Sequence, residues 1–309
     1  MKHHPQDFSY RHYLAPRWWP TWIVVGLMWL ISTLPWRAVQ ATGAGIGILL
    51  HKLGGSRRRV TEVNIAKCFP ELSPEAQAQL VRNTFIANAK GYTESTIGWF
   101  RNIDRYVERM EVHGREHIQA VLNSGQGVLL VGAHFSMMDM ALPLVARTIP
   151  VSYMYRPNDN GLLNAMVEKN RRRYCKQAFT KFELREMIEH IAEGNAVWYA
   201  IDQDMGPKHS VFAPFFGVPA ASVKAAGWLA RESGAAVIML SQFRGENGVY
   251  TLRFTPVEGV PTDDEVANAT AINKTLENEI RRDPAQYLWL HRRFKTRPEG
   301  EASFYGRKS

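Results

Sequence analysis

The residues whose types and spacing suggest chemistry are a histidine and an aspartate that follow a buried apolar run. The segment GVLLVGAHFSMMDMAL, residues 127–142, contains His134 and, five positions later, Asp139. Its apolar part predicts a strand over 128–131, followed by a helix that begins near Ser136. In open α/β sheets, ligands collect where strands end and turn into helices. His134 therefore stands where catalytic side chains are found.

An imidazole beside a carboxylate is the base and orienter of a catalytic triad. Asp139, about one turn into the expected helix, can accept a hydrogen bond from Nδ1–H of His134 and leave Nε2 free to accept a proton. No GxSxG segment occurs, and Cys68 and Cys175 lie far away in sequence, so we expect the nucleophile to be a hydroxyl group of the substrate. Taken alone, the spacing also fits a hydrogen-bonded strand-end histidine and an ordinary carboxylate in a first helical turn.

The elements that must position these residues are short apolar runs separated by amphipathic segments. The runs cover 128–131, 151–155, 196–201, 235–243 and 249–254. Such alternation predicts an α/β fold with a mainly parallel sheet and helices on both faces. The last two runs are close enough to pair as a hairpin. We assign this core to residues 111–309.

Two further strand ends carry polar side chains toward the same edge of the sheet. Arg156 follows the second run and is expected to stabilise an oxyanion or bind a lipid phosphate, although a surface arginine paired with Asp159 is the alternative. Asp202 and Asp204 follow the third run. We expect them to bind substrate or position a phosphate, and the alternative is that they cap loops or pair with Lys208 or Arg156. No metal site is expected, because the two cysteines have no CxxC spacing and no histidine cluster near them.

The first 36 residues differ in kind from the rest. WWPTWIVVGLMWLISTLPW, from Trp18 to Trp36, has no charged residue and is aromatic at both ends, which is typical of a membrane-spanning helix. Pro20 and Pro35 shorten the uninterrupted helix, so an in-plane or re-entrant anchor is the alternative. Basic residues are more numerous after this segment than before it, which favours a cytoplasmic location for the remainder.

We therefore expect three parts: a membrane anchor over 1–36, a membrane-proximal helical lead-in over 37–110, and the α/β core. Within the lead-in, Gly43, Gly45 and Gly47 lie among apolar residues and predict a helix that packs closely on a neighbour or on the membrane surface. A net charge of +9 and an isoelectric point near 9.6 favour acidic partners. No nucleic-acid-binding motif is present. The basic segments 171–173 and 291–297 fit headgroup phosphates, an acidic protein or a solvated surface, and His291 is not expected to be catalytic.

Several longer blocks resemble one family. They are RWWPTWIVVGLMWL, NIAKCFPELS, GVLLVGAHFSMMDM, YRPNDN, VWYAIDQDMGPKHSVFAPFFG and QYLWLHRRFKTRPEG, and they are similar to the late acyltransferases of lipid A biosynthesis, the lauroyl and myristoyl type. This family shares its HxxxxD or HxxxxE motif with glycerolipid acyltransferases, so the resemblance implies a glycerolipid-acyltransferase-like fold. It implies His134 as general base and Asp139 as orienter, at a position where many members carry Glu.

The resemblance also implies the substrates. The donor would be an acyl chain on acyl carrier protein, a co-substrate, with no cofactor. The acceptor would be a hydroxyl of a 3-hydroxyacyl chain on a Kdo-bearing lipid A precursor, at the bacterial inner membrane with the catalytic part facing the cytoplasm. The alternatives are an acyltransferase for another lipid, such as a glycerophosphate or an ornithine lipid, and a non-catalytic basic membrane adaptor. An adaptor leaves the strand-end positions of His134, Asp139 and Arg156 unexplained.

Overall fold

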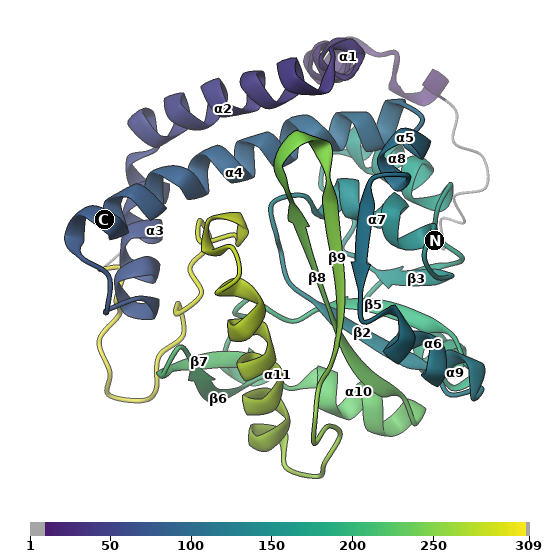
Figure 1. Cartoon of the computed structure of the whole chain (residues 1–309), viewed down its shortest axis with the longest axis vertical. Helices are drawn as coiled ribbons and strands as arrows, with labels where there is room; N and C mark the ends of the chain where they lie inside the picture. The colour runs from purple at the N-terminus through teal and green to yellow at the C-terminus, as the bar shows by residue number, and fades with distance from the viewer. Residues whose placement is uncertain (1–9, 307–309) are drawn as a thin grey trace.

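The computed structural model describes residues 10–306 of the 309-residue chain. Its centre is a seven-stranded sheet with the strand order β1-β9-β8-β2-β5-β3-β4 (Figure 1). Every neighbouring pair is parallel except β8 with β9, which form the expected antiparallel hairpin. The predicted mainly parallel α/β sheet is therefore confirmed. The strands are β1 (Met110–His113), β2 (Val128–Gly132), β3 (Val151–Met154), β4 (Ala178–Phe179), β5 (Ala196–Ala200), β8 (Ala236–Arg244) and β9 (Tyr250–Pro256).

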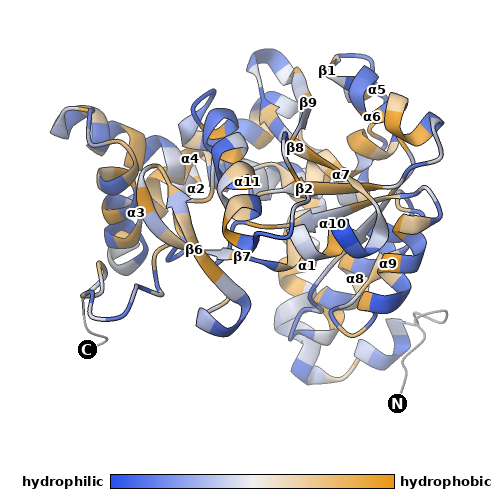
Figure 2. Ribbon diagram, turned by 90° about the horizontal axis from the view of Figure 1, so that it is seen from below, coloured by the Kyte–Doolittle hydropathy of each residue, from blue (hydrophilic) through white to orange (hydrophobic). Residues whose placement is uncertain are grey.

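Helices cover both faces of the sheet. Because β2 is central, all five of its residues are buried, and Figure 2 shows the central strands to be mostly hydrophobic. Val128 and Leu130 pack toward α6 and α7, whereas Leu129 and Val131 pack toward α9, α10 and α11. The helices that follow β1 are α6 (Arg115–Asn123), α7 (Met138–Ala146), α8 (Gly161–Arg172), α9 (Leu184–Ala192), α10 (Ala225–Ser233) and α11 (Glu265–Ile280).

The N-terminal part is helical. It comprises α1 (Trp19–Thr33), α2 (Trp36–Leu53), α3 (Gly55–Cys68), α4 (Pro74–Phe100) and the short α5 (Asp104–Val107). Helix α2 runs along α4, as Figure 1 shows. A Cβ atom at Gly43 would lie 2.6 Å from Cα of Lys90, and one at Gly47 would lie 2.5 Å from Cα of Ile86. The close packing predicted for this helix is therefore confirmed at two of its three glycines, while Gly45 has open space around it.

The membrane-spanning helix expected over Trp18–Trp36 is not found. The backbone of Leu34 is extended and Pro35 follows it, so α1 ends after 15 residues. Within residues 10–306, no helix combines the length and the apolar character needed to cross a membrane. Helix α1 packs on α4 and buries Val25.

The lead-in and the α/β core share hydrophobic cores and a buried ion pair. Val39 of α2 and Ile97 of α4 pack in the same cluster as Val128 of β2. Glu94 of α4 is fully buried and accepts hydrogen bonds from Nε of Arg244 at 2.6 Å and from the hydroxyl of Tyr250 at 2.8 Å. Removing one partner of such a pair would leave a buried charge. The contact fixes α4 to β8 and β9.

The chain after the sheet closes over one end of it. Strands β6 (Ser210–Phe215) and β7 (Val218–Val223) form a separate antiparallel hairpin. The segment that follows α11 brings Tyr287, Trp289 and Phe294 into the core beside Phe215. This segment also packs against the chain that follows β2, where Tyr287 forms a bridge with Phe135.

Candidate active site

The carboxyl ends of β2, β5 and β3 lie side by side and carry the predicted site residues. In the β2–β5 pair, Gly132 is in register with Ala200. His134 and Asp202 each lie two residues beyond these partners, so the register places them next to one another. The backbone N–H of His134 donates to Oδ2 of Asp202 at 2.9 Å, which continues the sheet ladder with a side-chain oxygen.

The imidazole of His134 is held by Asp202 and not by Asp139. Nδ1 of His134 lies 2.7 Å from Oδ1 of Asp202, whose side chain is fully buried. Since Nδ1–H donates to this carboxylate, Nε2 is the nitrogen left to accept a proton. The geometry thus gives Asp202 the orienting position predicted for Asp139, and both oxygens of Asp202 are engaged by His134. A direct contact of Asp202 with substrate, the other sequence prediction, does not fit this burial.

The charges of this pair stabilise one another. Burial lowers the pKa of His134, but the charge and hydrogen bond of Asp202 raise it more, and the net pKa lies above its ordinary value. Burial raises the pKa of Asp202, and the opposing effect of His134 leaves that pKa well below its usual range. Asp202 therefore stays ionised and favours the imidazolium that forms when His134 accepts a proton.

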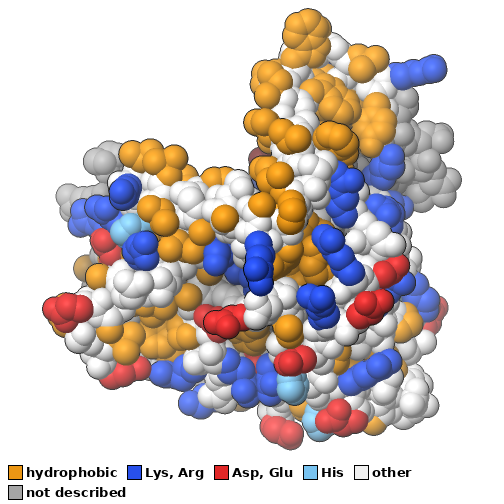
Figure 3. Space-filling model, turned by 45° about the horizontal axis from the view of Figure 1, so that its top comes forward, with side chains coloured by type: hydrophobic (Ala, Val, Ile, Leu, Met, Phe, Trp, Pro, Cys, Tyr) orange, Lys and Arg blue, Asp and Glu red, His pale blue; other side chains and the backbone are white. Residues whose placement is uncertain are grey.

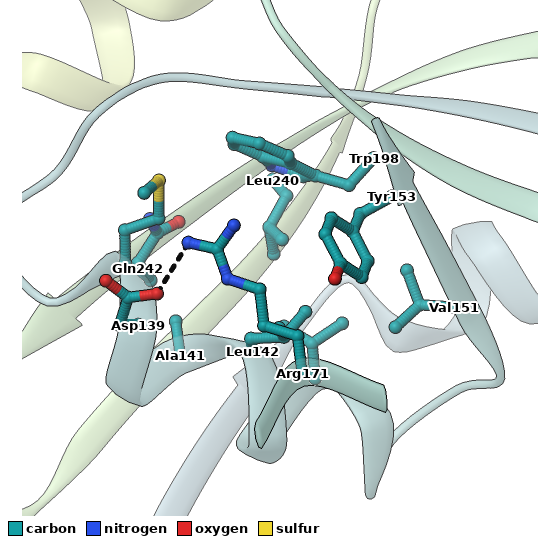
Figure 4. Close-up of a pocket in the computed structure, with 11 residues that line it drawn as sticks. Asp139, Ala141, Leu142, Val151, Tyr153, Arg171, Trp198, Leu240 and Gln242 are labelled. Atoms are coloured by element: carbon teal, nitrogen blue, oxygen red, sulfur yellow. Dashed lines mark hydrogen bonds and ion pairs between the residues drawn. The ribbon is translucent and has the colours of Figure 1, made fainter. Parts of the chain in front are cut away.

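Asp139 forms an ion pair with Arg171. Its Oδ1 lies 2.7 Å from Nη2 of Arg171 (Figure 4). Asp139 is in the first turn of α7 and Arg171 is in the last turn of α8. The sequence analysis assigned 171–173 to a basic surface, yet only 18% of the Arg171 side chain is exposed. The sequence contained an indication of this burial. Arg171 follows Leu163 and Val167 at intervals of four residues, so it shares one face of α8 with them.

Two cavities adjoin at Met138 and Asp139. One, of about 410 Å³, contains His134 and is bordered by Tyr92 and Ser95 of α4. The other, of about 470 Å³, has mainly apolar walls, among them Leu142, Val145, Val151, Trp198 and Leu240. A Cβ atom at Gly132 would lie 2.2 Å from Nε1 of Trp198, so a glycine in β2 is what lets the indole lie there. The two cavities together place a mainly apolar space next to the one that contains His134.

Three buried polar atoms of this apolar cavity lack hydrogen-bond partners among the described residues. They are the hydroxyl of Tyr153, Nε of Arg171 and Oε1 of Gln242. The guanidinium of Arg171 lies 5.5 Å from the ring centroid of Tyr153. Buried polar groups are almost always paired, so these atoms are placed to receive polar atoms of a ligand.

A wider groove of about 1110 Å³ opens on the other side of Asp139 and Arg171. Arg156 lines it together with Asn158 and Asn164, and Met28 of α1 also lines it. Arg156 is exposed. Within the described part of the chain it makes no hydrogen bond or ion pair, so the alternative pairing with Asp159 is not formed.

The side chain of Asp204 is buried and accepts hydrogen bonds from two loop residues. Its Oδ2 accepts the backbone N–H of Thr296 at 2.6 Å, and its Oδ1 accepts the Thr296 hydroxyl at 2.8 Å and the N–H of Gly206 at 2.9 Å. Only 2% of its side chain is exposed. The prediction of a substrate contact does not fit this geometry, whereas the alternative, a carboxylate that caps a loop, does. Within residues 10–306 no cluster of His, Cys, Asp or Glu could hold a metal ion.

The loop that carries His134 is clamped from two sides. A Cβ atom at Gly91 of α4 would lie 1.6 Å from the carbonyl oxygen of Ser136, so only glycine permits this contact. From the other side, Ser136 N–H donates to the carbonyl of Gln286 at 2.7 Å, and Leu288 N–H donates to the carbonyl of His134 at 3.0 Å. Neither clamp was predicted from the sequence. Both restrict the position of the imidazole.

A partly exposed histidine oriented by a buried carboxylate, beside an apolar cavity, is an arrangement suited to acyl transfer to a hydroxyl group. The family model described as bacterial lipid A biosynthesis acyltransferase matches residues 7–296, and the chain belongs to this family. It is therefore an acyltransferase of lipid A biosynthesis.

Similar proteins of Escherichia coli strain K12 span the same length. The lipid A biosynthesis lauroyltransferase is 38% identical over 94% of this chain and 96% of its own. The palmitoleoyltransferase is 35% identical over 97% of this chain and 99% of its own. The myristoyltransferase is 26% identical over 98% of this chain and 94% of its own. The three relatives are named for three different acyl chains.

Proposed function

We propose that this protein transfers a fatty acyl chain from acyl carrier protein to the hydroxyl of a 3-hydroxyacyl chain on a Kdo-bearing lipid A precursor. The single observation that carries the mechanism is the hydrogen-bonded pair of His134 and Asp202 at the strand ends. In this proposal Asp202, and not Asp139, orients the base. Family membership supports the lipid A acceptor over a glycerophosphate or an ornithine lipid.

In the proposed reaction the acceptor hydroxyl donates its proton to Nε2 of His134 as its oxygen attacks the thioester carbonyl carbon. A C–O bond forms, and the carbonyl electrons move to the oxygen to give a tetrahedral oxyanion. The C–S bond then breaks, and the imidazolium returns the proton to the thiolate of the carrier protein. Asp202 favours the imidazolium throughout, because its carboxylate stays ionised.

We assign stabilisation of the oxyanion to Arg171. Its guanidinium is held by Asp139, and the Tyr153 hydroxyl is near it. Among the described residues, neither Nε of Arg171 nor this hydroxyl has a hydrogen-bond partner. Preorganised donors of this kind supply a large share of catalysis in acyl transfer. Arg156, which is exposed in the wider groove, is better suited to a phosphate of the acceptor. Asp139 thus acts by positioning Arg171.

We assign the acyl chain of the donor to the apolar cavity. The cavity begins at Met138 and Asp139, which also border the His134 cavity, and Trp198 and Leu240 form part of its wall (Figure 4). A saturated chain gains by burying its methylene groups there. The size of the Trp198 side chain would then help to set the chain length.

We further propose that the protein lies on the cytoplasmic surface of the inner membrane. Hydrophobic side chains are exposed along α1 and α2, and Figure 3 shows them gathered over the protruding part of the molecule, with Lys and Arg side chains below. Such a combination suits an interfacial helix. The exposed members are Trp19, Ile23, Val24, Leu27, Trp29 and Leu30 of α1, and Ile46, Leu49, Leu50 and Leu53 of α2.

Mass spectrometry of lipid A tests this function. Cells that lack the activity would be complemented with the wild-type gene or with His134→Ala, and expression and folding of both proteins would be checked by immunoblot and circular dichroism. We expect one added acyl chain with the wild type, whose mass identifies the chain, and none with the folded variant. Acylation of a different lipid, or full activity of His134→Ala, would refute the proposal.

A further inference from the structure

A basic cavity at the junction of α1 and α2 lies outside the catalytic cleft. We propose that it binds the phosphate of an anionic membrane lipid and so fixes how the protein sits on the bilayer. This inference rests on the membrane-surface location proposed above. It concerns residues that take no part in the proposed chemistry.

Three arginines and no carboxylate line the cavity, which has a volume of about 860 Å³. Arg37 comes from α2, and Arg105 and Arg109 come from α5 and the segment after it. Nη2 of Arg105 lies 2.6 Å from the Tyr106 hydroxyl, which holds this guanidinium at the wall. Arg37 and Arg109 have no ion-pair partner within residues 10–306. Asp104, a nearby acid, is bound by Arg147 at 2.8 Å.

The start of α2 adds to this positive potential. Trp36 and Arg37 are its first two residues and both line the cavity. Pro35 precedes them, no side chain caps the helix, and its first turn contains no acidic residue. The N–H groups of a free helix N-terminus attract anions. The helix start and the three guanidiniums therefore act on the same space.

The surroundings favour a lipid as the source of the phosphate. Trp29 and Leu30 in the last two turns of α1 are 52% and 53% exposed, so hydrophobic side chains that can enter the bilayer lie close to the turn that leads into the cavity. An acidic protein would have to cover these side chains. A lipid places its headgroup phosphate at the depth of the arginines and its acyl chains beside the apolar residues.

Co-sedimentation with vesicles tests this site in the full-length protein. The vesicles would be phosphatidylcholine alone, or phosphatidylcholine with phosphatidylglycerol. The test variant is Arg37→Gln/Arg105→Gln/Arg109→Gln. The matched control, Lys181→Gln/Arg185→Gln/Lys274→Gln, removes the same charge from exposed positions on α9, its preceding loop and α11.

We expect the test variant to lose roughly one hundredfold in partitioning to anionic vesicles, about fivefold for each arginine. The control should lose only a few fold, and binding to neutral vesicles should be unchanged. Acyl transfer to detergent-dispersed acceptor should keep its wild-type rate, because the cavity is separate from the His134 site. Inorganic phosphate at constant ionic strength should not displace the protein from anionic vesicles.

Four outcomes would overturn the inference. Equal losses of vesicle partitioning in the test and control variants would mean that binding depends only on the net charge of the protein. Displacement by inorganic phosphate would identify a site for free phosphate. Loss of acyl carrier protein binding with vesicle binding retained would identify a protein-docking surface, and a lower transfer rate in detergent would place the cavity in the catalytic cleft. Absence of transfer by the wild type would refute the proposed function without affecting the vesicle result.

Discussion

At the residue scale, one carboxylate holds the imidazole of His134 and another holds the guanidinium of Arg171. Asp202 engages His134 through both oxygens, and Asp139 engages Arg171. In the proposed mechanism the two aspartates therefore affect catalysis through different groups. Their variants should differ in pH dependence even if both lower the rate.

Asp202→Asn should lower kcat by about a thousandfold or more, because the amide does not stabilise the imidazolium. The pKa of His134 lies above its ordinary value because of Asp202. Since the base must be unprotonated, kcat/KM of the wild type should rise as pH increases through this pKa. In Asp202→Asn the midpoint of the rise should move to lower pH.

Asp139→Asn is the comparison for this pH profile. It should lower kcat by roughly a hundredfold through the loss of Arg171 positioning, with a smaller shift of the midpoint, because Asp139 contributes less than Asp202 to the pKa of His134. A larger midpoint shift in Asp139→Asn than in Asp202→Asn would contradict the assignment of the two carboxylates.

Trp198→Ala should shift donor preference toward longer acyl chains, because removing the indole extends the apolar cavity. Competition between acyl carrier proteins that carry chains of different length, read by mass spectrometry of the product, measures the preference. Trp228→Ala, on α10 and 36% exposed, is the matched control. An unchanged preference in a folded Trp198→Ala protein would exclude the cavity as the chain site.

At the element scale, sequence periodicity predicted β2, β3, β5, β8 and β9 but not β1, β4 or the β6–β7 hairpin. Apart from the pairing of β8 with β9, it did not predict which strands are neighbours. The sequence analysis placed His134, Arg156 and Asp202 at strand ends, and the structure confirms those positions. Asp139 is the predicted partner of His134 because the two residues are close in sequence. Asp202 takes that place because β2 and β5 pair in the register Gly132 with Ala200, a long-range property that no local pattern encodes.

The prediction of a membrane-spanning helix was wrong for a local reason. It relied on the composition of the segment and not on the backbone geometry that its prolines impose. The hydropathy of residues 18–36 suits a spanning segment, but Pro35 and the extended Leu34 divide it into α1 and the start of α2. The glycines of α2 were interpreted correctly as packing positions. The requirement for glycine at position 91 was not predicted, because it arises from a contact with Ser136, which is distant in sequence.

Gly91→Ala should therefore destabilise the protein and impair catalysis. Its methyl group would meet the carbonyl oxygen of Ser136 at 1.6 Å, so α4 or the His134 loop must move, at a cost of about 1–3 kcal/mol or more. Gly45→Ala is the control, because no atom lies within 4 Å of its added Cβ and alanine favours a helix.

Thermal unfolding and kcat measure both effects. We expect a lower Tm and a lower kcat for Gly91→Ala, and a wild-type or higher Tm for Gly45→Ala. Equal Tm values for the two variants would show that α4 and the His134 loop can move apart without a loss of stability.

At the scale of the whole molecule, the N-terminal helices are part of the catalytic body. Met28 and Ile31 of α1 line the same groove as Arg156, and α4 is tied to the sheet by Glu94 and Arg244. Helix α1 therefore helps to shape the groove to which we assign the acceptor.

Deletion of residues 1–34 should leave a folded protein with impaired acceptor binding. The ion pair of Glu94 does not involve α1, and only Ile31 and Leu34 among the described residues of the deleted segment pack, partly buried, against the cores around β2, so cooperative unfolding should persist. The KM for detergent-dispersed acceptor should rise at least tenfold, with a smaller effect on kcat. Loss of a cooperative unfolding transition would mean that α1 is required for folding, and an unchanged KM would remove α1 from the acceptor site.

The clamps on the His134 loop have a consequence for the order of events during synthesis. The loop leaves the ribosome early, but its orienting carboxylate comes 68 residues later and the backbone groups of Gln286 and Leu288 come more than 80 residues after Asp202. A nascent chain that already carries His134, Asp139 and Arg171 thus has an imidazole without its final support. The support of the His134 imidazole and its loop is therefore complete only after residues 286–288 have been synthesised.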